Sequence, residues 1–133
     1  MQITRQADYA VRTVLYLAGL NHGSRAPTSK IAHEQNIPPS FLAKIVSQLS
    51  VAGVVQTSRG ARGGVTLARP SSDISLLEVI EAIDGPITLN ECVPDHSICP
   101  FGDDCPVHKI WREAQIELVE KLALTDFGTL TTQ

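Results

Sequence analysis

The chain has 133 residues, of which 43% are apolar and 19% charged, a composition that argues against a disordered protein and fits one folded domain with an extension. No apolar run approaches the roughly 20 residues of a membrane-spanning helix, and the N-terminus lacks a secretory pattern. Its three cysteines are an odd count that argues against a secreted disulfide framework. We therefore expect a protein of the cytoplasm.

The charges divide unevenly along the chain. The net charge is −3, but residues 1–70 hold eight Lys and Arg against two Asp and Glu, whereas residues 71–133 hold three against twelve. A basic half joined to an acidic half indicates that the first half faces a polyanion and that the second does not.

Two helices are expected first. In residues 3–20 the apolar side chains recur with the helical period, and Thr4 is a suitable N-cap. After a turn, a short helix follows over residues 30–35, and its cap is either Thr28 or Ser29.

A third helix is expected over residues 41–52. Ser40 is its candidate cap, and Gly53 occupies the glycine position that ends many helices. A helix of this size after a short helix and a tight break predicts a helix-turn-helix.

A β-hairpin follows the third helix. Residues 54–57 and 65–68 are typical of strands, and the tip between them, residues 59–64, is basic and glycine-rich. A hairpin directly after a recognition helix is the wing of a winged helix. Its glycines would allow close backbone approach to DNA, and Arg59 and Arg62 suit a narrow minor groove.

The second half starts with a linker at residues 70–73 and a short helix over residues 76–83. Ser75 and Glu78 have the spacing of a capping box at the start of that helix. A long helix then runs from Pro106 to about residue 124, because proline is well suited to a first helical turn.

This long helix carries an apolar stripe with little of its own domain left to pack on. We expect the stripe to pair with the same helix of a second subunit, although packing back on the first helix would also bury it. The predicted dimer interface consists of Val107, Ile110, Trp111, Ala114, Leu118 and Leu122.

All three cysteines lie in one loop, residues 92–108, together with several prolines and aspartates. Buried cysteine normally behaves as a small hydrophobe in a core, so this clustering favours ligand chemistry instead. Thiolates are soft ligands, and Cys92, Cys99 and Cys105 with one further ligand suit either an iron–sulfur cluster or a zinc ion. The spacing alone does not separate these two.

Four motifs together resemble the IscR/NsrR-type winged-helix regulators. They are the opening Met-Gln-Ile-Thr with Asp8-Tyr9-Ala10, the helix start Ser40-Phe41-Leu42, the Arg59–Gly64 wing, and the three-cysteine loop before a long helix. The resemblance implies a dimeric transcription factor with an iron–sulfur cluster whose state governs DNA binding, in response to redox state, nitric oxide or iron and cluster supply. The first cysteine gap has six intervening residues and the second five, against five in both gaps of comparable relatives.

The resemblance also implies roles for individual residues. Those on the outer face of the third helix would enter the major groove, those of the wing would enter the minor groove, and a last group would position the protein on phosphates. The three groups are Ser40, Ala43, Lys44 and Ser47; Arg59 and Arg62; and Thr4, Arg5, Tyr9 and Lys30.

Three residues compete to be the fourth cluster ligand. His108 follows Cys105 by three residues and is favoured, which would give a 2Fe–2S cluster within one subunit. Asp8 is the alternative, because some relatives use an acidic residue of the partner subunit on a 4Fe–4S cluster. His33, in the second helix, is the third and least favoured candidate.

The expected fold is mainly α with a small β-hairpin wing. Residues 1–70 would form the winged helix-turn-helix and residues 71–133 the ligand loop with the dimerisation helix. The expected function is a homodimeric regulator of a pseudo-palindromic operator, and the alternative is a regulator with zinc or a disulfide switch at the same cysteines. We do not expect an enzyme, because beside Cys105 and His108 no further catalytic group is apparent.

Overall fold

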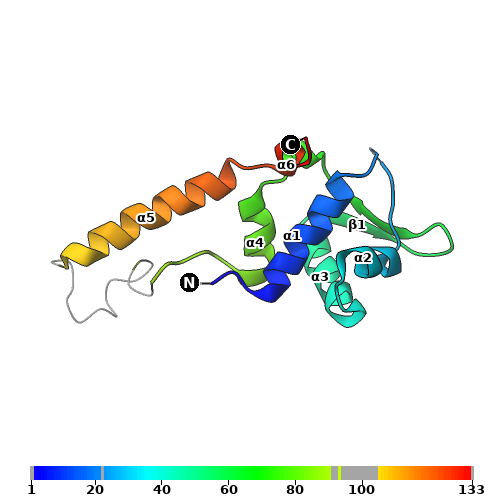
Figure 1. The fold of residues 1–133 in the computed structure, drawn as a ribbon, viewed down its shortest axis with the longest axis horizontal. Coiled ribbons are helices and arrows are strands. Elements are labelled where there is room, and N and C mark those ends of the chain that lie inside the picture. Colours follow the sequence, from blue (N-terminus) through cyan, green and yellow to red (C-terminus); the bar gives the residue numbers. More distant parts are fainter. Residues whose placement is uncertain (1, 22, 91–92, 94–104, 133) are drawn as a thin grey trace.

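The computed structural model describes residues 2–21, 23–90, 93 and 105–132. Six α-helices, one 3-10 helix and a two-stranded antiparallel sheet are formed by these residues. Figure 1 shows a body at one end, from which the long helix α5 projects to the other end. The predicted mainly helical fold with a single hairpin is confirmed.

The first helix, α1 (Arg5–Ala18), is the centre of the body. Thr4 is its N-cap as predicted, and the Thr4 hydroxyl accepts a hydrogen bond of 3.1 Å from the Ala7 amide. The helix buries Ala7, Tyr9, Ala10, Thr13, Val14 and Leu17.

The next two helices, α2 (Thr28–Gln35) and α3 (Pro39–Val51), form the predicted helix-turn-helix. Asn36 adopts the left-handed conformation at φ 54° that the tight turn requires. The expected caps of both helices are wrong. Pro27 and Pro38 occupy the two N-cap positions, because each proline holds its backbone extended and the helix starts at the next residue.

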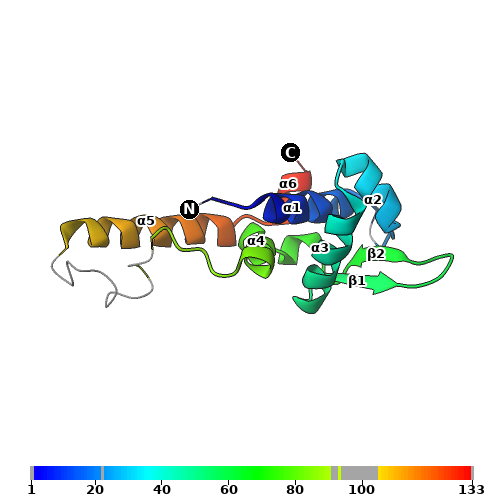
Figure 2. The same cartoon turned by 90° about the horizontal axis from the view of Figure 1, so that it is seen from below.

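The hairpin consists of β1 (Val55–Ser58) and β2 (Gly64–Leu67) and follows α3, as predicted. A third segment joins it, because Ala26 and Val65 exchange backbone hydrogen bonds of 3.0 and 2.8 Å. The hairpin is therefore fixed to the loop that leads into α2 (Figure 2).

Beyond the hairpin, the 3-10 helix η1 (Ser71–Asp73) replaces the expected linker and leads to α4 (Leu76–Asp84). Half of the capping box forms: the Ser75 hydroxyl accepts from the Glu78 amide at 3.1 Å. The Glu78 carboxylate does not complete the box, because it pairs with the Arg69 guanidinium.

The chain ends in α5 (Pro106–Ala123) and the short α6 (Phe127–Thr131). Asp126 caps α6, and its carboxylate accepts hydrogen bonds from the amide and the hydroxyl of Thr129 at 2.7 and 3.0 Å. These hydrogen bonds hold the pKa of Asp126 below its ordinary value. Phe127 is completely buried in the core of the body, so α6 anchors the end of the chain beside α1.

Most of α5 lies outside the body. It contacts α4, and the Leu89 amide donates to the Gln115 side chain at 2.9 Å. Figure 1 shows α5 leading away from α1, so packing against the first helix does not bury its apolar stripe. Within the described part of the chain, none of the helices combines the length and apolar character needed to cross a bilayer.

The anchoring of α6 generates a prediction about stability. Phe127→Ala should lower the free energy of unfolding by about 3–5 kcal/mol, because it removes a fully buried aromatic side chain and leaves a cavity. Leu124→Ala is the control, since Leu124 is 77% exposed and should change stability by less than about 0.5 kcal/mol. Urea denaturation at one protein concentration measures both, and equal midpoints for the two variants would contradict the anchoring role.

Candidate functional site

The third helix has one face in the core and one face in solvent. Its buried side chains are Leu42, Ile45, Val46 and Leu49. The four residues predicted to face a nucleic acid, Ser40, Ala43, Lys44 and Ser47, are all exposed on the other side. Three of these side chains are small and only Lys44 is charged, so this face of α3 is free to enter a groove of a nucleic acid.

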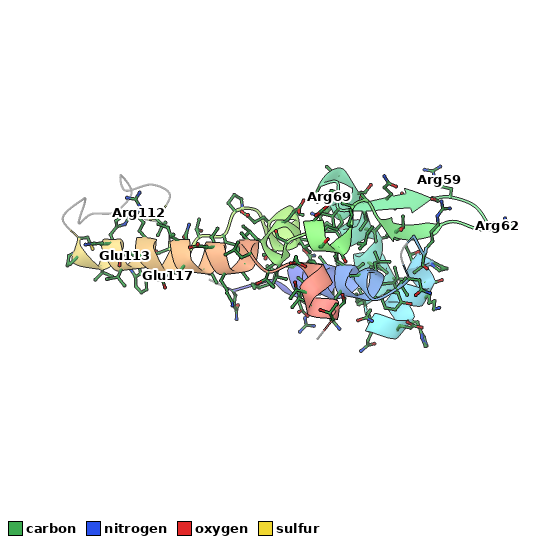
Figure 3. All side chains as sticks on the ribbon, turned by 90° about the horizontal axis from the view of Figure 1, so that it is seen from above. Arg59, Arg62, Arg69, Arg112, Glu113 and Glu117 are labelled. Carbon is green, nitrogen blue, oxygen red and sulfur yellow. The ribbon has the colours of Figure 1, made fainter. Side chains whose placement is uncertain are left out.

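The wing lies at the same end of the body as α2 and α3, and Figure 3 shows Arg59 and Arg62 at its tip. Both arginines are exposed. A third arginine joins them, because Arg25 donates to the Arg62 carbonyl at 3.5 Å. Sequence reasoning missed Arg25, since its proximity to the wing depends on the Ala26–Val65 pairing and not on local sequence.

The glycines of the wing have a structural role that the sequence interpretation did not include. A Cβ at Gly63 would lie 2.3 Å from the Ser58 carbonyl oxygen, and one at Gly64 would lie 2.7 Å from the Ala26 carbonyl oxygen. The Gly63 amide also donates to the Gly60 carbonyl at 2.9 Å. These glycines close the tip and allow the third segment to pair, whether or not DNA is near.

The four predicted phosphate contacts fall into two groups. Arg5 and Lys30 are exposed. The Thr4 hydroxyl, in contrast, donates its proton to Asp84 at 2.6 Å, and Tyr9 is only 9% exposed. The structure therefore places Thr4 and Tyr9 in structural positions, where the one joins α1 to α4 and the other packs in the core.

The basic side chains of α2, α3 and the wing tip are not engaged in ion pairs within the described part of the chain. Across the described ranges, the two ion pairs join Arg12 to Asp8 at 3.4 Å and Arg69 to Glu78. Neither pair includes a basic residue of α2, α3 or the wing tip. Exposed residues of α3, of α2 with the segment before it, and of the wing together form one surface, here called the basic surface. It consists of Ser40, Ala43, Lys44, Ser47, Arg25, Lys30, Arg59 and Arg62. The basic surface can therefore attract a polyanion without first breaking an ion pair.

The candidate metal ligands are only partly described. Cys105 is the half-buried N-cap of α5, and His108 in the first turn of the same helix is 6% exposed. Cys92 and Cys99 lie outside the described residues. No group of three or more His, Cys, Asp or Glu side chains is close enough to hold a metal among the residues that are described, so the ligand set stays a prediction.

The two alternative ligands lie elsewhere in the chain. Asp8 is an exposed residue of α1 and pairs with Arg12, whereas His33 is an exposed residue of α2. Figure 1 shows α1 and α2 in the body and the first turn of α5 at the opposite end of the molecule. Within one chain, the structure therefore brings neither Asp8 nor His33 to Cys105.

The predicted dimer stripe is largely exposed in the single chain. Val107, Ile110 and Trp111 are exposed, and the other three members are half-buried. Ile116 is also exposed on α5, although it lies outside the predicted stripe. These side chains are large and apolar, and their number on one helix is unusual for a surface that faces only water.

Comparison with known proteins identifies the family of this chain. Residues 3–133 match the Rrf2 family, described as "Iron-dependent Transcriptional regulator". Protein aau3 of Rhizobium meliloti is 38% identical over 116 residues, which cover 86% of this chain and 74% of that protein. The transcriptional regulator IscR of Escherichia coli is 32% identical over 130 residues, which cover 98% of this chain and 80% of IscR.

Solved structures show the same fold. The IscR of T. potens superposes with a TM-score of 0.78 at 21% identity and covers 99% of this chain and 88% of its own. CymR of Staphylococcus aureus in its oxidized form gives a TM-score of 0.79 at 24% identity and covers 100% and 98%. The winged-helix fold and the match over almost the whole sequence agree: the chain belongs to the Rrf2 family of transcriptional regulators.

Proposed function

We propose that this protein is a homodimeric DNA-binding regulator whose operator binding is controlled by an iron–sulfur cluster, with redox state, nitric oxide or iron and cluster supply as the signal. The observation that carries the DNA-binding part is the basic surface, where the free face of α3 and the arginines of the wing lie at one end of the molecule. Such a regulator would act in the cytoplasm, as the sequence also predicts.

The helix-turn-helix supports contact with double-stranded DNA. An exposed helix face of this size fits the major groove, while the wing arginines reach the adjoining minor groove. A symmetric dimer would place two such surfaces on a pseudo-palindromic operator with half-sites about 34 Å apart.

The projecting helix supports the homodimer. A second copy of α5 would cover Val107, Ile110 and Trp111 and remove their apolar surface from water. Figure 1 shows that α5 projects from its own body, which would leave room for the same helix of a second copy beside it.

The donor set supports the cluster. The family is described as iron-dependent, and three cysteines provide soft thiolate ligands. Cys105 is the N-cap of α5, so the helix holds the backbone that carries this thiol. Cys92, Cys99 and Cys105 would hold the cluster with His108, whose burial in the first turn of α5 keeps its imidazole away from bulk water.

The cluster, when bound, supplies a group that oxidants, nitric oxide or iron loss can alter. The protein residues bind it and connect it to the start of α5. Asp8 of a partner subunit remains the alternative fourth ligand, and it would favour a 4Fe–4S cluster over the 2Fe–2S cluster expected with His108.

The second candidate function uses the same cysteines with zinc or as a thiol switch. The oxidized form of S. aureus CymR has this fold, and Cys105 is accessible enough to react, because it is only half-buried. Visible absorbance separates the candidates, since iron–sulfur proteins are coloured and zinc sites and disulfides are not.

The basic surface generates the first functional prediction. Arg59→Ala should weaken operator binding and reduce the dependence of the binding constant on salt, because one positive charge leaves the contact. Arg112→Ala is the matched control: Figure 3 shows Arg112 on α5, at the end of the molecule opposite to the wing. Fluorescence anisotropy across a salt series measures both, and an unchanged affinity and slope in Arg59→Ala would remove the wing from the interface.

The apolar stripe on α5 generates the second functional prediction. Leu118→Glu should produce monomers or insoluble protein, because it places a charge where two helices would meet. Lys121→Glu is the control, since Lys121 is exposed and polar on the same helix. Sedimentation velocity measures the masses of the soluble fractions, and an unperturbed dimer of Leu118→Glu would move the interface elsewhere.

The predicted cluster ligands generate the third functional prediction. Anaerobically purified protein should contain iron and sulfide and absorb visible light, and His108→Ala should lose or alter that spectrum. Asp8→Ala and His33→Ala should retain it. Iron and sulfide counts with the visible spectrum measure all four proteins. An unchanged His108→Ala beside an altered Asp8→Ala would move the fourth ligand to the partner subunit.

A further inference from the structure

A hollow of about 380 Å³ opens between α2 and α3. Its floor consists of the buried side chains of Ala32, Ile37 and Leu42, and its lining is completed by the exposed residues Thr28, Ser29, His33, Pro39 and Ala43. The three floor side chains carry no hydrogen-bonding group, whereas the polar lining residues are exposed, so the bottom of the hollow is suited to an apolar ligand group.

Small residues keep the hollow open. Ala32 on α2 and Ala43 on α3 both line it, and each contributes only a methyl group. Pro39 and Ala43 lie one turn apart on α3 and therefore share one exposed face of that helix. A longer side chain at position 43 would extend over the floor and fill the space.

The surroundings identify the partner as DNA. Lys30 on α2 and Lys44 on α3 are exposed on the two helices that form the hollow. The hollow also adjoins Ala43, the position of the basic surface that lacks any hydrogen-bonding group. In the major groove of DNA, the 5-methyl group of thymine is the one apolar group that a base pair presents.

We propose that this hollow is a binding site for the 5-methyl group of a thymine in each operator half-site, and that Ala43 determines this specificity. The proposal deepens the proposed DNA-binding function and depends on it. The floor would remove the methyl group from water, while Ala43 would contact its edge without competing for a hydrogen bond.

The first test removes only the methyl group. An operator is selected from random duplexes with the full-length protein, and each thymine is replaced in turn by deoxyuridine. One thymine per half-site should show a loss of affinity of about fourfold, which corresponds to one buried methyl group. The remaining thymines should change by less than about 1.5-fold, since their methyl groups stay in water.

The second test assigns the effect to the hollow. Ala43→Leu fills the space and should abolish the difference between thymine and deoxyuridine at that position. Ser50→Leu is the matched control, because Ser50 is exposed two turns further along α3 and neither lines the hollow nor belongs to the basic surface; it should keep the fourfold ratio. If Ala43→Leu does not bind the operator, Ala43→Gly replaces it and should reduce the ratio.

The outcomes separate this proposal from the proposed function. Tight operator binding with no deoxyuridine-sensitive thymine would overturn the methyl site and leave the DNA-binding function intact. A sensitive thymine whose ratio is unchanged in the Ala43 variants would also overturn it, because the methyl group would then act through DNA shape. Failure to select any operator would overturn the DNA-binding function itself.

Discussion

The burial of the apolar face of α1 is the interaction on which the rest of the structure depends. This helix packs against α2, α3, α4, α6 and β2, and Val14 on it is completely buried. One continuous core therefore includes residues from both halves of the chain, and those of the second half are Ile74, Val79 and Phe127. The helix-turn-helix does not fold around its own small core, but shares one with the elements that carry the projecting helix.

Polar contacts at the start and in the middle of α1 extend this connection. At its start, the Thr4 amide and hydroxyl both bond to Asp84, the last residue of α4. Further along, Arg12 donates to the Gln35 carbonyl at the end of α2 at 3.0 Å. The chain leaves α4 directly toward the cysteine loop, so α1 is the common neighbour of the segment that leads to the predicted ligands and of the helix-turn-helix.

Features set by a few neighbouring residues could be predicted from the sequence, whereas features set by distant ones could not. The Thr4 and Ser75 caps and the hairpin depend on local spacing and are confirmed. The Ser40 cap failed because prolines are also able to start helices. The hydrogen bond from Thr4 to Asp84 and the hollow between Ala32 and Ala43 depend on contacts between residues far apart in the sequence, which no local pattern predicts.

The pairing of Ala26 with Val65 has a mechanical consequence. Two backbone hydrogen bonds join the segment before α2 directly to the second strand of the wing, so the distance between wing and helix-turn-helix is fixed. The wing cannot swing away from the helix-turn-helix unless these two hydrogen bonds break. On an operator whose grooves do not match this spacing, the duplex would have to deform, and base steps that the protein never touches would then contribute to affinity through their stiffness.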